Sequence, residues 1–145
     1  MVDRVLDITT LGATPALPGV VRIAWERRVA DGYRCTPGQW KFNQTTVQIT
    51  LAGCGACWPD GGGAGRALPP GRAMVYVGHR HRALAYGLAD AVTSWEFCYI
   101  NLHGEAAQAM IADLATIHGF VIPIAVNHPV ISECLDLLPR RGHAH

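Results

Sequence analysis

The sequence predicts a mainly β domain, a small β-barrel followed by one or two α-helices at its C-terminal end. Short segments in which apolar and polar residues alternate recur at the close spacing typical of sandwiches and barrels. Turn signals such as Leu68-Pro-Pro-Gly71 separate these segments. After Gly104 the apolar residues change to helical spacing, so that strands come first and helices last.

The length and composition fit one folded domain. The chain has 145 residues, of which 50% are hydrophobic, enough for one core. Its formal charge is +1, spread without long runs, so we expect no nucleic-acid binding by this chain alone. No apolar run approaches the ~20 residues of a membrane span, and the N-terminal residues lack the layout of a secretory signal. We therefore expect a cytoplasmic protein without a membrane partner, and the odd number of cysteines, five, favours reduced thiols.

The chain divides into three predicted parts. Residues 1–20 predict an extended N-terminal arm outside the core, because Pro and Gly interrupt a segment of little periodicity. Residues 21–104 contain the predicted barrel, and residues 105–145 the C-terminal helices and a tail. What the arm covers stays open.

The first predicted strand, residues 20–29, is half buried. Its apolar residues, Val21, Ile23, Trp25 and Val29, are at odd-numbered positions and face one side of the strand. Most of its charged residues, Arg22, Glu26 and Arg28, are at even-numbered positions and face the other side. The turn dipeptides Asp31-Gly32 and Pro37-Gly38 leave residues 33–35 as a short strand at most. Residues 45–51 alternate again, with Val47 and Ile49 on one face and Gln48 and Thr50 on the other.

The remaining strands follow at short intervals. Residues 52–58 predict a strand interrupted by glycines, and residues 60–63 a flexible hairpin connection. Residues 73–77, 83–88 and 95–102 complete the series.

The segment after Gly104 predicts an amphipathic helix over 105–118. Its apolar residues Met110, Ile111, Leu114 and Ile117 repeat at helical spacing, and Gly119 favours a C-terminal stop. A second, shorter helix is predicted from Pro129 until Pro139, because proline suits the first helical turn.

Two motifs contain metal-ligating residue types. Cys54-Gly-Ala-Cys57 has the spacing of half a zinc site, yet in an extended strand its two thiols point to opposite faces. His79 and His81 share a parity, so that both face the interior of a barrel if the segment is extended, with Glu96 or His103 as the nearest third ligand. The default interpretation is buried thiols and solvated histidines, so we predict no metal and no cofactor.

The aromatic residues predict a pocket for a small, partly polar molecule. Trp95, Phe97 and Tyr99 share one face of their strand, and such rings offer flat stacking surfaces beside oriented polar groups. The predicted ligand-binding residues are Tyr99, Trp95, His81, Gln48, Trp40 and Tyr86. The alternative is that the rings fill a small barrel. No nucleophile motif accompanies them, since the chain lacks a Gly-x-Ser-x-Gly elbow, so we predict no catalytic residues and no enzyme.

Four segments, taken in order, resemble the N-terminal sensor domain of AraC-type transcriptional regulators. They are Asp31-Gly-Tyr-Arg34, Thr50-Leu-Ala-Gly-Cys-Gly55, Leu68-Pro-Pro-Gly71 and WEFCYINLHG at residues 95–104. The last segment is the most specific, because an alanine-rich helix and Gly119-Phe-Val-Ile-Pro-Ile124 follow it. The resemblance covers residues 25–124.

The resemblance implies a cupin-like barrel, a double-stranded β-helix or jelly roll, that binds a small effector. It also implies an arm that folds over the pocket and helices that form a homodimer. Tyr99 takes the position of an aromatic residue that stacks on the effector, and His79-Arg-His81 lies near the mouth of the barrel. Leu102 departs from the family, where an aromatic residue is usual, and the HxH-plus-glutamate set of cupin enzymes is missing from residues 45–57.

We therefore expect a small-molecule effector-sensing and dimerisation domain of an AraC-family regulator. Members of that family bind DNA through paired helix-turn-helix units, and none follows residue 139 here, so we expect a sensor fragment. One alternative is a small metal-dependent cupin enzyme that uses His79 and His81. Another is an interaction module whose helices pair two chains around an inert barrel.

Overall fold

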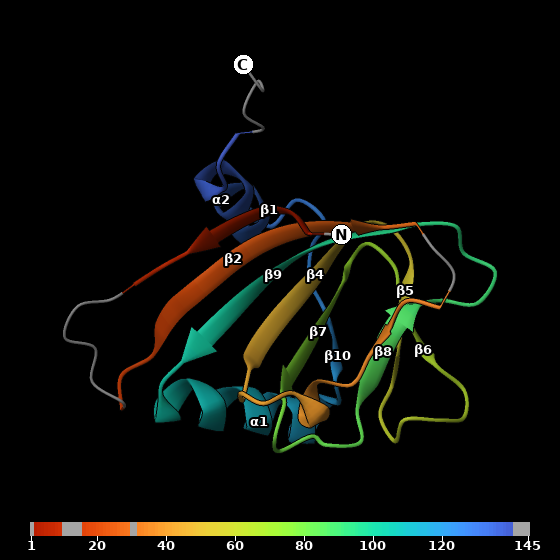
Figure 1. Cartoon of the computed structure of the whole chain (residues 1–145), viewed down its shortest axis with the longest axis horizontal. Helices are drawn as coiled ribbons and strands as arrows, with labels where there is room; N and C mark the ends of the chain where they lie inside the picture. The colour runs from red at the N-terminus through yellow and green to blue at the C-terminus, as the bar shows by residue number, and fades with distance from the viewer. Residues whose placement is uncertain (1, 10–15, 30–31, 141–145) are drawn as a thin grey trace.

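The computed structural model describes residues 2–9, 16–29 and 32–140 (Figure 1). In chain order the strands and helices are β1 (Val2–Asp7), β2 (Gly19–Arg28), β3 (Arg34–Cys35), the 3₁₀ helix η1 (Pro37–Gln39), β4 (Thr45–Gly53), β5 (Gly55–Trp58), β6 (Arg66–Leu68), β7 (Arg72–Val77), β8 (Ala85–Leu88), β9 (Trp95–His103), α1 (Glu105–His118), β10 (Val121–Pro123) and α2 (Pro129–Leu137).

The strands of the described residues form two antiparallel sheets. The large sheet has the order β1-β2-β9-β4-β7-β10, and the small sheet has the order β3-β8-β5-β6. The mainly β prediction with C-terminal helices is confirmed. Most of the predicted strands are present within one or two residues of the expected bounds, whereas β1, β6 and β10 were not predicted.

The register of the large sheet separates polar from apolar residues. Across the central strands Gln48 lies opposite Tyr99, and Tyr99 in turn lies opposite Ala24 of β2. Because directly opposite residues project to the same side, these residues and their alternate neighbours form one inner face toward the small sheet. The intervening residues, such as Ile49 and Cys98, form an outer face.

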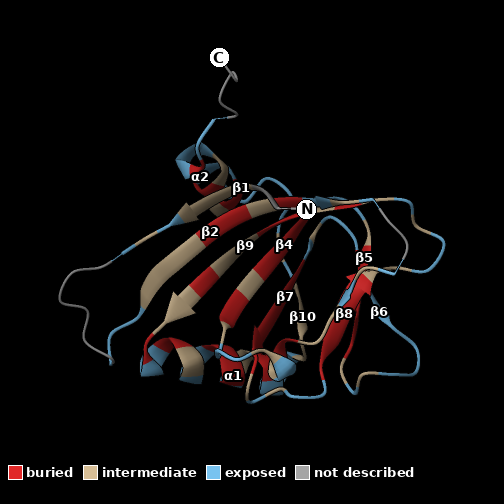
Figure 2. Ribbon diagram, in the orientation of Figure 1, coloured by how far each residue is buried: buried red, intermediate tan, exposed pale blue. Residues whose placement is uncertain are grey.

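The two helices cover the outer face. Ile111 and Ala115 of α1 pack against Val75 and Val77, while Ile131 of α2 packs in a cluster with outer-face residues of β4, β7 and β9. Figure 1 shows α1 at one end of the large sheet and α2 beside β1 and β2. Figure 2 shows that β4 and β7, between these covers and the small sheet, contain mostly buried residues. Neither helix is long and apolar enough to cross a membrane.

Both predicted helices are confirmed, but the expected apolar stripe of α1 is only partly buried. The buried residues are Ala107, Ile111, Ala112 and Ala115. Met110 and Ile117 are 55% and 72% exposed. Small alanine side chains let the helix lie close to the sheet, and this turns the larger residues outward.

The prediction that the N-terminal residues form an arm outside the core is wrong for residues 2–8. β1 pairs with β2, and Leu6 and Ile8 pack on a buried cluster that contains Ile23 and Cys134. The pairing with β2 defines this edge strand, whose own sequence has little alternation. Residues 10–15 of the arm, Asp31 of the expected turn and residues 141–145 of the tail lie outside the described residues.

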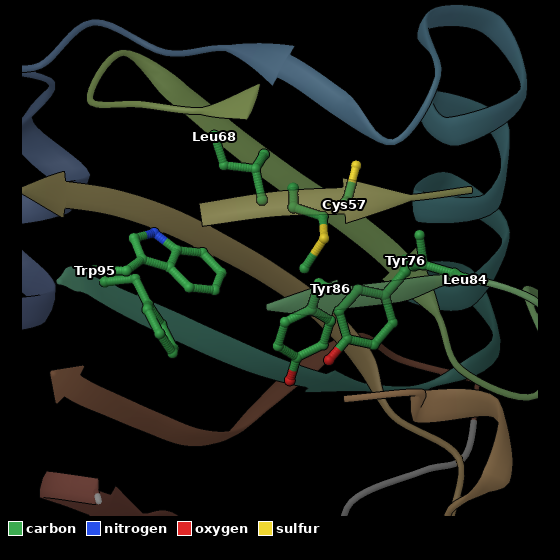
Figure 3. Packing of buried hydrophobic residues seen from close by; sticks show 8 residues of the cluster. Cys57, Leu68, Tyr76, Leu84, Tyr86 and Trp95 are labelled. Atoms are coloured by element: carbon green, nitrogen blue, oxygen red, sulfur yellow. The ribbon is translucent and has the colours of Figure 1, made fainter. Parts of the chain in front are cut away.

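The inner face packs on the small sheet around Trp95 (Figure 3). The indole is fully buried, and its Nε1 donates to Thr50 Oγ1 at 3.0 Å, while Thr50 donates to the carbonyl of Leu68 at 2.9 Å. Gly55 of β5 lies directly against the ring, where an added Cβ would be 2.3 Å from Trp95 Cε2. The two sheets therefore meet across a glycine that leaves room for the tryptophan.

We predict that Gly55→Ala destabilises the fold by about 2 kcal/mol, because the added methyl group overlaps the buried indole. Gly62→Ala is the matched control, since nothing lies within 4 Å of a Cβ added there. Its free energy of unfolding should stay within about 0.5 kcal/mol of that of the unchanged protein. Urea unfolding followed by tryptophan fluorescence measures both, and equal stabilities of the two variants would contradict this packing.

Candidate ligand-binding cavity

A cavity of about 540 Å³ lies between the inner face of the large sheet and the small sheet. The large sheet contributes Arg22, Glu26, Arg28, Gln48, Tyr76, Phe97 and Tyr99. The small sheet contributes Cys35 and Tyr86, with Tyr33 next to β3. Gln39 of η1 and residues 40–42 and 44 line the rest, and Lys41 and Phe42 there are exposed to solvent. The volume is in the range of pockets that bind small molecules.

The charged side of the cavity comes from β2. The alternation of this strand predicts one buried face, yet both faces are covered: Ile23 on the outer face is 4% exposed, and Glu26 on the inner face is 5% exposed. The charged residues at alternate positions of this strand, Arg22, Glu26 and Arg28, line the cavity. The signal for these missed residues lies in neighbouring strands together, because β2 and β4 both place polar residues on alternate positions and pair with the same strand, β9.

Glu26 is a buried carboxylate with a direct cationic partner. The Nη2 and Nε groups of Arg28 both donate to Glu26 Oε2, at 2.6 and 3.0 Å. The Arg28 guanidinium also lies 4.4 Å from the centre of the Tyr33 ring, a cation–π contact. Arg28 therefore connects the carboxylate to the aromatic wall, and this pairing offsets the cost of burying Glu26.

Arg22 connects the cavity to β1. Its Nε donates to Asp7 Oδ1 at 2.6 Å, and the side chains are 40% and 62% exposed. The carboxylate raises the pKa of Arg22, against an opposing effect of burial, and the nearby Tyr99 hydroxyl raises it further. Arg22 thus bridges an exposed edge strand and an inner-face tyrosine.

Gln48 has an unsatisfied polar group at the cavity wall. The residue is 3% exposed, and among the described residues its side-chain Nε2 has no hydrogen-bond partner. A buried donor without a partner costs about 1–3 kcal/mol. Each such group calls for an explanation, and within the described part of the chain Gln48 is the buried polar side chain that lacks a partner.

All four tyrosines of the chain line the cavity, at positions 33, 76, 86 and 99. Burial is the largest cause of a raised pKa at each of them. Figure 3 shows the rings of Tyr76 and Tyr86 side by side, with centroids 6.0 Å apart. The phenols of the folded protein therefore keep their protons to a higher pH than a free tyrosine does, and each hydroxyl can donate a hydrogen bond.

Four of the six predicted ligand-binding residues lie together at this cavity: Tyr99, Gln48, Trp40 and Tyr86. Trp95 does not line it, because its indole fills the core between the sheets. His81 does not line it either. Its Nδ1 accepts from the backbone N–H of Val77 at 2.9 Å, and its ring packs edge-on against Phe120 at 4.8 Å.

The expected extended segment through His79 and His81 is a turn that follows β7. The backbone N–H groups of Arg80 and His81 both donate to the carbonyl of Val77. His79 Nε2 lies 3.0 Å from the carbonyl oxygen of Trp40. Within residues 2–9, 16–29 and 32–140, no three His, Cys, Asp or Glu side chains are close enough to hold a metal ion.

Of the Cys54 and Cys57 pair, Cys57 fits the default interpretation of a buried thiol in a strand, and Cys54 does not. Cys57 is fully buried in β5, and burial raises the pKa of its thiol to about 11, so it remains an inert thiol near neutral pH. Cys54 lies between β4 and β5 and is half buried. All five cysteines have free thiols.

A second hollow, about 740 Å³, lies beside residues 88–93. It is the larger of the two by volume, yet Trp58 is the one buried residue along its described wall. The buried polar residues Glu26 and Gln48 line the first cavity, which we therefore select as the candidate site.

The fold and the cavity define a mainly β domain with a polar, aromatic site between two sheets. No protein-family model matches the chain, and no curated protein matches it either.

We predict that Tyr33, Tyr76 and Tyr86 do not ionise in the folded protein near pH 10, because burial raises the pKa of each well above that of a free tyrosine. The folded state keeps the phenol protons that the unfolded chain releases near pH 10, so the free energy of unfolding falls as the pH rises above that value. Most of the phenolate absorbance should then increase together with the loss of the circular dichroism signal. Ionisation of more than one tyrosine in a protein that is still folded would contradict the burial of these side chains, and the urea-unfolded chain is the control.

We also predict that Gln48→Met stabilises the ligand-free protein by about 1 kcal/mol. Methionine has nearly the shape of glutamine and removes the unpaired donor. Gln108→Met on α1, outside the cavity, is the control for the same substitution and should change stability by less than about 0.5 kcal/mol. Urea unfolding at neutral pH measures both, and a loss of stability in Gln48→Met would show that the amide is satisfied.

Proposed function

We propose that this chain is the effector-sensing and dimerisation domain of an AraC-type transcriptional regulator, with a cupin-like arrangement of its two sheets. The observation that carries the proposal is the cavity between the sheets with the buried, unpaired amide of Gln48 on its wall. An inert barrel would favour an apolar residue at this position. Tyr99, which the resemblance assigns to effector stacking, is at the same cavity.

In this proposal the effector acts through β1. The ion pair between Arg22 and Asp7 joins a cavity residue to the edge strand. Arg4 of the same strand donates to the carbonyl oxygens of Leu135 and Leu138 at 2.9 and 3.1 Å, at the end of α2. A ligand with different affinity for two arrangements of β1 shifts their populations, and α2 follows.

The homodimer of this proposal forms through α1. Met110 and Ile117, seven residues apart, lie on one side of the helix and are both exposed. A second copy of the chain would cover this apolar surface. Contact with DNA would be made by a helix-turn-helix domain outside this sequence, in a cytoplasmic regulator.

We predict that Tyr99→Ala and Ile117→Asp separate sensing from dimerisation. In a thermal-shift screen of sugars, aromatic acids and other small metabolites, a stabilising compound should lose at least tenfold in affinity, about 1.4 kcal/mol, with Tyr99→Ala. Ile117→Asp should leave that affinity unchanged and weaken the dimer in sedimentation experiments. Each variant serves as the control for the other.

Two outcomes would contradict the proposal. Absence of binding by every compound would reject sensing, and would leave the interaction module if the dimer is still lost in Ile117→Asp. A compound whose affinity does not depend on Tyr99 would place the binding site outside this cavity.

A further inference from the structure

The charges around the cavity favour an anionic ligand. Three cationic side chains line it, Arg22, Arg28 and Lys41, against the single carboxylate of Glu26. Glu26 pairs with Arg28, and Asp7, which is 62% exposed and outside the lining, pairs with Arg22 at 2.6 Å, so the surplus around the cavity is the one positive charge of Lys41. A site with a surplus of positive charge attracts anions and repels cations.

The hydrogen-bonding groups favour a ligand with acceptors. The Gln48 amide has an N–H group with no acceptor among the described residues, and the four tyrosine hydroxyls line the same cavity. A carboxylate is the small group that offers the most acceptor positions and one negative charge. Binding of such a group would satisfy Gln48.

The apolar part of the wall consists of rings. Tyr76 and Tyr86 lie with their centroids 6.0 Å apart and their planes 31° apart, and Phe97 and Tyr99 lie 6.4 Å and 36° apart. Trp40 lines the cavity beside them. The two ring planes of each pair are tilted, and a flat aromatic partner can pack against them by offset or edge-on contact.

We propose that the cavity binds a small aromatic carboxylate of about two rings, with its carboxylate at Gln48 and Arg22 and its rings against the tyrosine wall. This inference rests on the proposed sensing function and adds the chemical class of the effector. The volume of about 540 Å³ exceeds the need of a single ring and fits a bicyclic ligand.

The sheet register places the carboxylate subsite. Gln48 lies opposite Tyr99, and Tyr99 lies opposite Ala24. Arg22 is on the same face of β2 as Ala24, one alternate position away, and its guanidinium lies beside the Tyr99 hydroxyl. Gln48, Tyr99 and Arg22 thus form one cluster of donors.

The test compares four probes of related size on the full chain by isothermal titration calorimetry. They are 2-naphthoate, its neutral isostere 2-naphthamide, the aliphatic carboxylate decanoate and the neutral sugar arabinose. We expect 2-naphthoate to bind at least tenfold more tightly than each of the other three. An equal or higher affinity for 2-naphthamide overturns the role of the charge, and an equal or higher affinity for decanoate overturns the role of the rings.

Variants locate the subsite. Gln48→Met should weaken 2-naphthoate binding about tenfold, and Arg22→Gln should reduce the preference for 2-naphthoate over 2-naphthamide to about twofold or less. Arg22→Lys keeps the charge and should restore most of that preference. Arg27→Gln, at an exposed residue on the outer face of the same strand, is the matched control and should keep it in full.

The outcomes separate this inference from the proposed function. If arabinose or decanoate binds in a Tyr99-dependent manner and 2-naphthoate does not, the sensing function stands and the ligand class is wrong. If 2-naphthoate binds with an unchanged preference in Arg22→Gln and unchanged affinity in Gln48→Met, the subsite is wrong. If no probe and no metabolite binds, both proposals fail.

Discussion

The register between β2, β9 and β4 is the constraint on which the rest of the structure depends. Because side chains alternate, one alignment of these strands fixes two surfaces at once. The row Ala24, Tyr99 and Gln48 faces the small sheet, and the next row, with Ile49 and Cys98, faces the helices. A shift by one residue would bury charged groups under α1 and α2 and place apolar residues in the cavity. Packing of the apolar outer face against the helices therefore stabilises the one strand register that places the polar residues in the cavity.

Burial of polar side chains on the inner face costs free energy, and hydrogen bonds offset this cost for some residues but not for all. Thr50 and Asn101 are buried and hydrogen-bonded, through Leu68 and Thr46, and Glu26 is paired with Arg28. Gln48 alone among the buried polar side chains of the described residues lacks a partner for its amide. Selection for stability alone would favour an apolar side chain here, as in Gln48→Met. An unsatisfied donor at a cavity wall is thus better explained by a ligand than by folding.

Much of the fold follows from local patterns, whereas the site depends on long-range pairing. Alternation and helical spacing predict most strands and both helices, because each element buries one face. β1 could not be predicted in this way, because its own sequence has little alternation and its position depends on pairing with β2. The same alternation misassigns Arg22 and Glu26 to a solvent-facing side, because one strand cannot show that a second sheet covers its polar parity. Trp95 and His81 share the residue types of the site, yet the first fills the core and the second caps a turn.

The inner face is divided between a closed half and an open half. At the closed half Trp95 and Phe97 stack with centroids 4.3 Å apart, and the small sheet meets them through Gly55 without leaving space. At the open half the facing part of the small sheet is β3, which is two residues long and continues into η1. So short a strand does not fill the gap above Gln48, and the chain there turns away to form the mouth of the cavity. Trp95 packs on Phe97 and Tyr86, which also line the cavity, so the closed half supports the aromatic wall from behind while the polar groups, an unpaired amide and a buried carboxylate, lie at the open half.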